Sequence, residues 1–475
     1  MKKIKYCLWS LLVLFMINHV DAQSYKSWSD KVGAKTFPKQ EKTYWANSYG
    51  AISDTVTVNT LAVQKTIDAC SKKGGGIVAF KEGTYVLGSI FLKSNVHLRI
   101  DKNVTILGSQ NFSDYKEINT RIAGIEMIWP AALINLIDAT NAAVTGEGVI
   151  NGRGKFCWDK YWKMRKQEYE PKGLRWIVDY DAKRVRTILV QNSSDITLSK
   201  VTLKNAGFWT VQLLYSTRVT VDGLIIRNND DGVGPSTDGI DIDSSTWVLV
   251  ENCDIDCNDD DFCLKAGRDW DGLRVNRPTE YIVIRNSIAR KGGGLLTLGS
   301  ETSGSIRHVL ATGLTALGTG NGFHIKSAST RGGVVSDIWF INNQLDSVVN
   351  AFNFTMNWNP TYSYSTLPAG YVYDSLPAHW KVMLQKVIPE SKGIPVFRDI
   401  HIEDINAKGV KKIITANGMA GSYLENFNFK NVRIKAQSKG DLNYVKDWVF
   451  DDTYFESTDQ KPMVLKNSIS TKELK

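Results

Sequence analysis

The chain has 475 residues, of which 43% are hydrophobic and 23% charged, with a formal net charge of +9 at pH 7. This composition is typical of a globular protein with a large core and excludes a largely disordered chain. The basic balance favours an acidic partner, for which acidic polysaccharide, nucleic acid and anionic membrane all qualify, although mild basicity also serves solubility alone.

Residues 1–22 are predicted to be a secretory signal. Lysines at positions 2, 3 and 5 precede the apolar run CLWSLLVLFMI, which is too short to span a bilayer well, and a small-residue cleavage pattern ends at Ala22. No later stretch is apolar enough for a membrane helix. We therefore expect an exported protein, periplasmic or secreted, that does not insert into membranes and whose residues 23–475 form one domain.

Cysteine spacing gives no sign of a metal site. After removal of the signal an odd number of cysteines would remain: Cys70, Cys157, Cys253, Cys257 and Cys263. Cys253 and Cys257 could form a disulfide or could be buried as small apolar residues. Their spacing is not a zinc signature and no histidine pair accompanies them, so we predict no metal and no cofactor.

One helix is predicted near the N-terminus, at residues 60–73. Val63, Ile67 and Cys70 fall on one face of it, and a run of three glycines from Gly74 ends it. Helical periodicity then nearly disappears from the sequence. This short helix is in the right place to cap the open end of a stack of strands.

Short β runs recur after this helix, and many end in Asn, Asp or Gly. Val219 in RVTVDGLIIRNN follows Ile196 in DITLSKVTLKNA by 23 residues, and a later pair, Val248 and Ile282, is spaced more widely. Such a period, with strands and turns but no helix, indicates a parallel β-helix with loops inserted between coils. A β-propeller would need four strands per blade and a steadier period, and a leucine-rich repeat would need its Leu and Asn ladder.

Two stretches break the repeat, residues 155–176 and residues 352–380. The first is basic and aromatic, and the second is aromatic and irregular. Both are predicted to be loops that leave the solenoid. Loops on one side of a rigid stack commonly build a substrate groove, although these could also be packed excursions without a role in binding.

Three aspartates are predicted to form one cluster. Asp259 follows Asp238 by 21 residues, close to one coil, and Asp260 comes next. Clustered carboxyl groups shift one another's pKa, so one can hold a proton while another is ionised, as general acid and general base catalysis requires. Aspartates at bends also cap turns, and a cluster of oxygen ligands suits calcium, so both alternatives remain open at this point.

Four motifs, in the family's order, resemble glycoside hydrolase family 28, the polygalacturonase family. STDGIDI (residues 236–242) resembles its Asn-Thr-Asp motif, and NDDDFCLKAG (258–267) its Asp-Asp motif. GGGLLTLGSE (292–301) resembles its Gly-His-Gly motif, and FHIKSASTRGG (323–333) its Arg-Ile-Lys motif. The resemblance extends from the glycine run after the predicted helix to about Asn343.

The resemblance implies an all-β fold, a right-handed parallel β-helix, and inverting hydrolysis of α-linked galacturonic acid chains. It implies that Asp259 is the general acid, that Asp238 and Asp260 hold and activate the attacking water, and that Lys326 binds a substrate carboxylate. Lys265, close to these acids, is a further candidate substrate-binding residue.

Several positions depart from the family's pattern. Ser236 replaces the motif's Asn, Gly293 or Gly294 stands where its His would be, and His324 replaces its Arg. The resemblance implies that these positions, His324 included, belong to sugar-binding subsites, so a rhamnogalacturonan or a decorated galacturonide is expected rather than simple homogalacturonan. The arginine-bearing segment that follows the acids, beginning at Arg268, resembles exo-acting members and makes Arg268 another candidate substrate-binding residue.

Two other functions compete with hydrolysis. The same acids would suit a calcium-dependent lyase of pectin, and a non-catalytic glycan-binding β-helix would explain the missing motif residues. For each of these functions the expected partner is an acidic polysaccharide, not nucleic acid, and the protein is expected to be a monomer.

Overall fold

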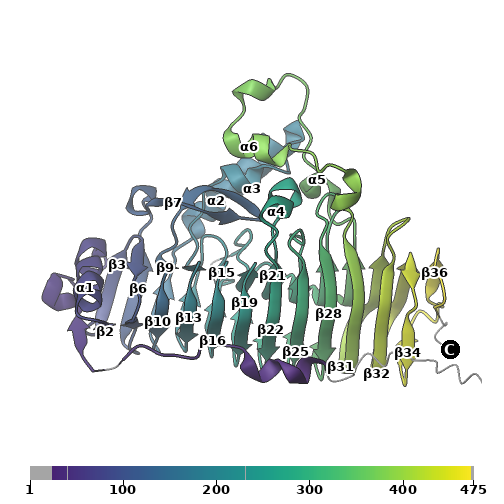
Figure 1. Ribbon diagram of the computed structural model, residues 1–475, viewed down its shortest axis with the longest axis horizontal. Helices are drawn as coiled ribbons and strands as arrows, with labels where there is room; N and C mark the ends of the chain where they lie inside the picture. Colours follow the sequence, from purple (N-terminus) through teal and green to yellow (C-terminus); the bar gives the residue numbers. More distant parts are fainter. Residues whose placement is uncertain (1–23, 40, 231, 472–475) are drawn as a thin grey trace, which may run out of the picture.

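The computed structural model, which describes residues 24–471 except 40 and 231, is a parallel β-helix (Figure 1). Each coil contributes three strands, so a strand usually pairs in parallel with the third strand after it. The predicted signal at residues 1–22 lies outside the described residues. Among the helices that are described, none combines the length and the apolar character needed to cross a membrane.

The strands form three faces. The face below the functional site, which we call the floor, contains β4 (Ile90–Leu92), β9 (Ile134–Ile137), β12 (Ile188–Gln191), β15 (Val211–Leu214), β18 (Ile240–Asp243), β21 (Phe262–Lys265), β24 (Gly294–Leu298), β27 (Asn321–Lys326), β30 (Asn350–Thr355) and β36 (Val464–Lys466). Face B contains β1 (Thr43–Trp45), β2 (Gly76–Ala79), β5 (Val96–Arg99), β10 (Thr140–Thr145), β13 (Ser194–Ser199), β16 (Thr217–Asp222), β19 (Thr246–Glu251), β22 (Thr279–Arg285), β25 (Ile306–Thr312), β28 (Val334–Ile341), β33 (Val445–Lys446) and β34 (Val449–Asp451). Face C contains β3 (Gly83–Leu87), β6 (Val104–Gly108), β11 (Val149–Asn151), β14 (Thr202–Lys204), β17 (Ile225–Arg227), β20 (Asp254–Asp256), β23 (Ile288–Ala289), β26 (Thr315–Leu317), β29 (Gln344–Asp346) and β35 (Tyr454–Ser457). Two long strands, β31 (Val396–Asn417) and β32 (Leu424–Asn443), bend through all three faces.

The core is a stack of apolar side chains between these faces. Ile196 pairs with Val219, as the 23-residue spacing predicted, and Val248 pairs with Ile282 despite the longer loop between them. All four side chains are buried, and Val309 continues the row on the next coil. Apolar side chains at equivalent positions of successive coils stack on one another. The inward residues are therefore buried inside the solenoid, and no separate layer of helices or strands is needed to cover them.

Bends between face B and face C use a left-handed backbone at equivalent positions of successive coils. Asn252, Asn286 and Asn342 have φ values of 56°, 50° and 54°. Asparagine adopts this conformation more readily than most residues, because its short side chain can bond locally. This explains why so many of the β runs in the sequence end in Asn.

The N-terminal end of the stack is capped as predicted. Helix α1 (Thr60–Lys72) buries Val63, Thr66, Ile67 and Cys70 against the first coil. The preceding residues follow an unpredicted course, because two short 3-10 helices, η1 (Ser24–Ser27) and η2 (Ser29–Lys31), lie against face B far along the solenoid (Figure 1).

That N-terminal segment covers a row of aromatic side chains. Trp247, Tyr281 and His308 stack on one another, with ring centroids 4.3 and 4.8 Å apart. Trp28 packs edge-on against Tyr281, and the backbone N–H of Gly33 donates to the carbonyl of Trp247. The segment therefore shields apolar surface that face B would otherwise expose.

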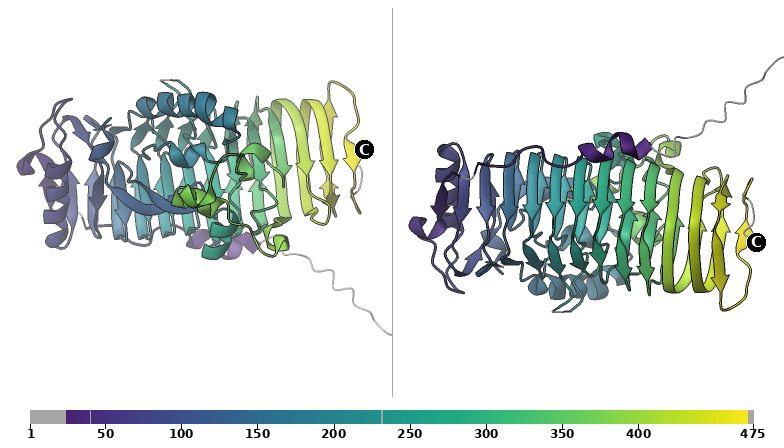
Figure 2. Two further views of the ribbon diagram at one scale, coloured as in Figure 1. Left: turned by 90° about the horizontal axis from the view of Figure 1, so that it is seen from above. Right: turned by 90° about the horizontal axis from the view of Figure 1, so that it is seen from below.

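Segments that leave the coils gather on the floor side of the molecule, above its middle (Figures 1 and 2). They comprise the antiparallel hairpin β7 (Glu117–Ile122) and β8 (Ile125–Pro130), and the helices α2 (Lys155–Lys163), α3 (Val178–Asp181), α4 (Asp269–Val275), α5 (Pro360–Ser363) and α6 (Ala378–Met383). The hairpin, the insertion at residues 152–187 and the excursion at residues 356–395 share one apolar cluster, to which Trp129, Trp176 and Trp380 contribute. These three segments therefore pack together as one wall.

Two sequence predictions need correction or completion. The second loop begins later than predicted, because Phe352 and Phe354 remain in β30 and point into the core. The alternation of these two phenylalanines with polar residues marks a strand, not a loop. Cys253 and Cys257 are free and buried, so of the two alternatives the packing one is correct.

Truncation of one core side chain should destabilise the stack. For Ile282→Ala we expect the free energy of unfolding to fall by about 2–5 kcal/mol, since the cavity would lie between two rigid neighbouring coils. Urea denaturation followed by circular dichroism measures this. The exposed Lys291→Ala serves as the control and should change stability by less than about 0.5 kcal/mol. Equal effects of the two substitutions would contradict a continuous stacked core.

Candidate active site

Successive side chains of a floor strand point alternately into the core and outwards, and several of the outward side chains are charged. In β21, Phe262 and Leu264 belong to the core, so Cys263 and Lys265 face the other way. The register between β18 and β21 then places Asp243 beside Lys265 on the neighbouring coil. Acids and bases on neighbouring coils are thus brought into one row by the register alone.

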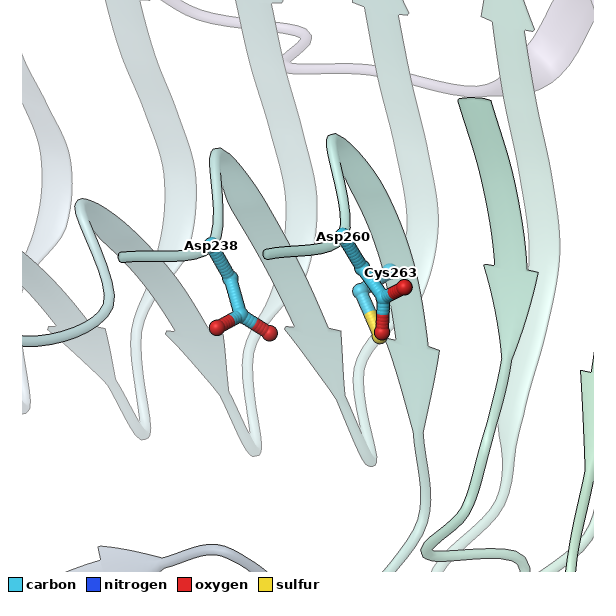
Figure 3. Close-up of side chains that lie close together, drawn as sticks. All are labelled: Asp238, Asp260 and Cys263. Carbon is cyan, nitrogen blue, oxygen red and sulfur yellow. The ribbon is translucent and has the colours of Figure 1, made fainter. Parts of the chain in front are cut away.

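The structure brings the three predicted aspartates together. Asp238 and Asp260 each lie two residues before a floor strand, and Ile240 pairs with Phe262, so these two aspartates are neighbours on adjacent coils (Figure 3). The offset between paired residues of these two coils is 22 residues, so the structural neighbour of Asp238 is Asp260 and not Asp259, which follows Asp238 by 21 residues. Asp238 and Asp260 are buried, whereas Asp259 is half-buried.

All three carboxyl groups line one narrow pocket of about 80 Å³, together with Lys265 and Lys326. The rest of its lining comes from the wall and the floor: Ala123, Arg175, Asp179, Phe208, Trp209, Ser236, Ser300, Glu301, Trp358 and Tyr362. Aromatic rings and charged groups in one concave site are typical of a place where a polar, flat ligand binds.

Two buried lysines form ion pairs with different acids of the pocket. The Nζ atom of Lys326 lies 2.8 Å from Oδ2 of Asp260 and 4.5 Å from the centre of the Trp358 ring. Nζ of Lys265 lies 3.5 Å from Asp238 and 3.6 Å from Glu301. Both ammonium groups are therefore held by protein carboxyl groups.

These contacts push the pKa values of two adjacent aspartates in opposite directions. Burial and the charge of Asp260 raise the pKa of Asp259. Burial alone would also raise the pKa of Asp260, but the ammonium groups of Lys326 and Lys265 outweigh it and lower this pKa to about 2. One carboxyl group therefore tends to keep its proton while its neighbour is ionised, which is the division of roles that acid and base catalysis needs.

The remaining acids complete a balance of charge. Burial and the charge of Asp259 raise the pKa of Asp238 to about 8, and burial and Asp238 raise that of Asp241 well above its usual range. Burial opposes ionisation of Glu301 too, but Lys265 lowers the pKa of that carboxyl group. The two lysines thus favour the ionised forms of Asp260 and Glu301, whereas burial favours the protonated forms of Asp238 and Asp241.

Two of the predicted substrate-binding residues lie apart from the pocket lining. Arg268 is fully buried behind it, and donates to Asp269, to the Tyr180 hydroxyl and to two backbone carbonyls. These contacts join α4 to the wall. His324 is buried in the floor row, and neither ring nitrogen has a hydrogen-bond partner among the described residues. Burial and the charge of Lys326 lower its pKa to about 3, so this imidazole is neutral.

The third aspartate of the DDD run, Asp261, has a different environment. Its side chain is fully buried, and Oδ1 accepts a hydrogen bond from Sγ of Cys257 at 3.4 Å. Burial raises the pKa of Asp261 well above its usual range, so it is an uncharged residue of the interior. Gly292 makes room for it, because a Cβ atom there would lie 2.2 Å from Oδ2 of Asp261.

Gly293 and Gly294, one of which stands where the motif has its histidine, also lie beside the acids. A Cβ atom on Gly293 would be 3.1 Å from Oδ1 of Asp260, and one on Gly294 would be 3.5 Å from the same atom. A side chain at either position would therefore crowd Asp260, and a Cβ atom on Gly294 would also lie 2.5 Å from Oγ1 of Thr297.

One group of possible metal ligands is present among the described residues. One ligand atom from each of Asp238, Asp260 and Cys263 lies within 4.8 Å of the others (Figure 3). Calcium prefers six to eight oxygen ligands, whereas this group includes a thiol that burial keeps protonated by raising its pKa. Lys326 and Lys265 already hold the two carboxyl groups, and their charges would repel a cation. The donor set therefore does not fit calcium.

Several pocket residues were not found from the sequence. Glu301 ends the third motif, so its position next to the acids could have been inferred from the motif order. Arg175, Asp179 and Tyr362 come from the wall, whose segments have no repeat. The two loops predicted at residues 155–176 and 352–380 contain Arg175 and Tyr362, but neither of them includes Asp179.

Comparisons with known proteins agree with this geometry. Residues 70–370 match the family "Glycosyl hydrolases family 28". A protein of Vitis vinifera named "Probable polygalacturonase" is 28% identical over 403 residues, which cover 82% of this chain and 74% of that protein. An exo-poly-alpha-D-galacturonosidase of Dickeya chrysanthemi is 24% identical over 447 residues, which cover 86% of this chain and 70% of that protein.

A solved structure supports the fold. The crystal structure of a hyperthermoactive exopolygalacturonase from Thermotoga maritima is similar over 93% of this chain and 96% of that one, with a TM-score of 0.71 and 23% sequence identity. This likeness confirms the predicted right-handed parallel β-helix. Since the family match spans well over half of the sequence and contains all three clustered aspartates, the chain belongs to glycosyl hydrolase family 28.

Proposed function

We propose that the protein hydrolyses α-linked galacturonic acid units of a pectic polysaccharide, removes them from a chain end, and inverts the anomeric configuration. The family and the names of the relatives support hydrolysis of a galacturonan. The observation that carries the proposal is the pair Asp259 and Asp260, two adjacent carboxyl groups in one pocket whose pKa values are shifted in opposite directions.

In this mechanism Asp259 donates its proton to the glycosidic oxygen as the bond to the leaving sugar breaks. Asp260, kept ionised by Lys326, takes a proton from the attacking water. Carboxyl oxygens of Asp238 and Asp260 lie within 4.8 Å of each other, a separation that one water molecule can bridge. Asp238, on the other side of that water, holds it in position for the attack.

Attack at a chain end is supported by the shape of the site. The pocket is small, and the hairpin, the insertion and the excursion contribute Ala123, Arg175 and Tyr362 to its lining. Since these three segments share one apolar cluster, they form a firm wall and not a set of independent loops. A walled pocket of this size suits a terminal sugar better than the middle of a long chain.

The nature of the substrate follows from the positions that depart from the family pattern. The absence of the motif's histidine, where Gly293 or Gly294 stands, and of its arginine, where His324 stands, favours a galacturonide that carries a substituent or a neighbouring rhamnose over plain homogalacturonan. Such a substrate is outside the cytoplasm of the cell that degrades it, in agreement with the predicted signal at residues 1–22.

Product analysis tests the proposal. The enzyme is incubated with homogalacturonan, rhamnogalacturonan and short oligogalacturonides, and the products are separated and followed by nuclear magnetic resonance. We expect free galacturonic acid as the first product, with the anomeric configuration opposite to that of the bond cleaved. An ultraviolet-absorbing unsaturated uronide, formed only without chelator, would instead establish the lyase alternative. Absence of turnover on all three substrates would refute the proposal.

Removal of the acid should abolish turnover and preserve the fold. For Asp259→Asn we expect kcat to fall by about 10²–10⁴-fold, because the amide cannot protonate the leaving oxygen. Asp256→Asn is the matched control, since Asp256 lies on face C, outside the pocket. Circular dichroism should show both variants folded. Activity retained in Asp259→Asn would exclude this residue as the acid.

Lys326 should set the pH range of activity. It lowers the pKa of both Asp260 and Asp259, so its removal raises both values. In Lys326→Met the acid limb of the kcat/KM profile, where Asp260 becomes ionised, should therefore move to higher pH. The alkaline limb, where the acid loses its proton, should move in the same direction. The exposed Lys200→Met should leave the profile unchanged, and an unshifted acid limb in Lys326→Met would contradict this role.

A further inference from the structure

One wall residue of the pocket has a charge that the protein leaves partly unpaired. Arg175 lies in the insertion at residues 152–187, between Leu174 and Trp176, both of which are buried in the wall's apolar cluster. Its neighbours therefore fix the backbone there, and its side chain lines the pocket that contains the three aspartates. The side chain remains 15% exposed.

The contacts of Arg175 use only part of its guanidinium group. Nη1 donates to Oδ2 of Asp179 at 2.5 Å, and the group lies 4.9 Å from the centre of the Tyr362 ring. Among the described residues, no hydrogen bond from Nε or Nη2 of Arg175 is formed. These donors are therefore free to bind a ligand in the pocket.

Asp179 cannot neutralise Arg175 fully, because it serves two arginines. Its other oxygen, Oδ1, accepts a hydrogen bond from Nη2 of Arg184 at 2.9 Å. Arg184 is fully buried, and its remaining contacts are with backbone carbonyls and with the rings of Tyr161 and Phe208. Two guanidinium groups thus share one carboxylate, and one positive charge is left over at the pocket wall.

The other cations of the pocket are already matched. Lys326 is held by Asp260 and Lys265 by Asp238, Asp241 and Glu301. The floor position where the family motif has an arginine is occupied by the neutral His324. An anionic ligand would therefore find its unmatched positive charge on the wall.

We propose that Arg175 binds the carboxylate of the sugar in the pocket and selects a uronic acid over a neutral sugar at that position. A guanidinium group can donate two parallel hydrogen bonds to a carboxylate, which fixes the orientation of the sugar as well as its charge. A neutral sugar would leave a partly buried charge unpaired, and such a mismatch is strongly discriminated against. This inference rests on the proposed function and adds to it the residue that recognises the carboxylate of the substrate.

Binding of two monosaccharides provides the test. Galacturonic acid and galactose differ only in the carboxylate at C6, and the affinity of each is measured by calorimetry for the wild type, Arg175→Gln and Arg175→Lys. For Arg175→Gln we expect affinity for galacturonic acid to fall about 10- to 100-fold, the range for hydrogen bonds to charged groups, with galactose changed less than about 2-fold. Arg175→Lys should give an intermediate loss, since it keeps the charge but not the paired donors.

Arg165→Gln is the matched control. Arg165 belongs to the same insertion and also pairs with an acid, Glu170, but does not line the pocket. It should bind both sugars as the wild type does. Equal losses for both sugars in Arg175→Gln would mean that Arg175 only supports the wall, and would overturn the inference, as would no loss for either.

The same variants separate this inference from the proposed function. If the wild type hydrolyses oligogalacturonides and Arg175→Gln lowers kcat/KM mainly through a higher KM, both hold. If the wild type is active and Arg175→Gln keeps the wild-type KM, only the role of Arg175 fails. A wild type without activity on any galacturonide removes the proposed function whatever the calorimetry gives.

Discussion

The register between β18 and β21 holds together three acids that would otherwise repel one another. Backbone N–H groups of Gly239 and Ile240 donate to the carbonyls of Asp260 and Asp261, and the apolar residues that follow are locked into the core. Because this pairing continues over the whole solenoid, the two coils cannot separate to relieve the repulsion locally. Burial and this repulsion are instead expressed as a shift of pKa, which raises that of Asp238 to about 8.

Two lysines turn this crowded cluster into an asymmetric one. Without them, removal from water would raise the pKa of both Asp259 and Asp260, and either could keep the proton. Lys326 contacts Asp260 directly, so the ionised form is stabilised there and the proton is left to Asp259. Replacement of buried ion pairs by apolar residues often costs little stability, so their presence here is better explained by what they do to the acids.

Local repetition is what made the fold predictable. The spacing from Ile196 to Val219 identified one coil correctly, and the separation of about one coil between Asp238 and the pair Asp259 and Asp260 placed them on neighbouring coils. The floor strands of only four residues were harder to recognise from the sequence. In FCLK, for example, only Phe262 and Leu264 point into the core, and two alternating apolar residues are too few to identify a strand. Arg175 depends on contacts between segments far apart in the chain, and no local period reports such contacts.

Arg175 and His324 together suggest how specificity is divided between repeat and insertion. On the floor, a side chain is constrained by its neighbours on two coils, and the sequence departs there from the family motifs, at His324 and at Gly293 or Gly294. The wall is free of the repeat, and it presents Arg175 on a base anchored by Trp176. In the proposed mechanism, a rigid floor that carries the acids is thus combined with a wall that carries the proposed carboxylate-binding group, because the two are held by separate sets of contacts.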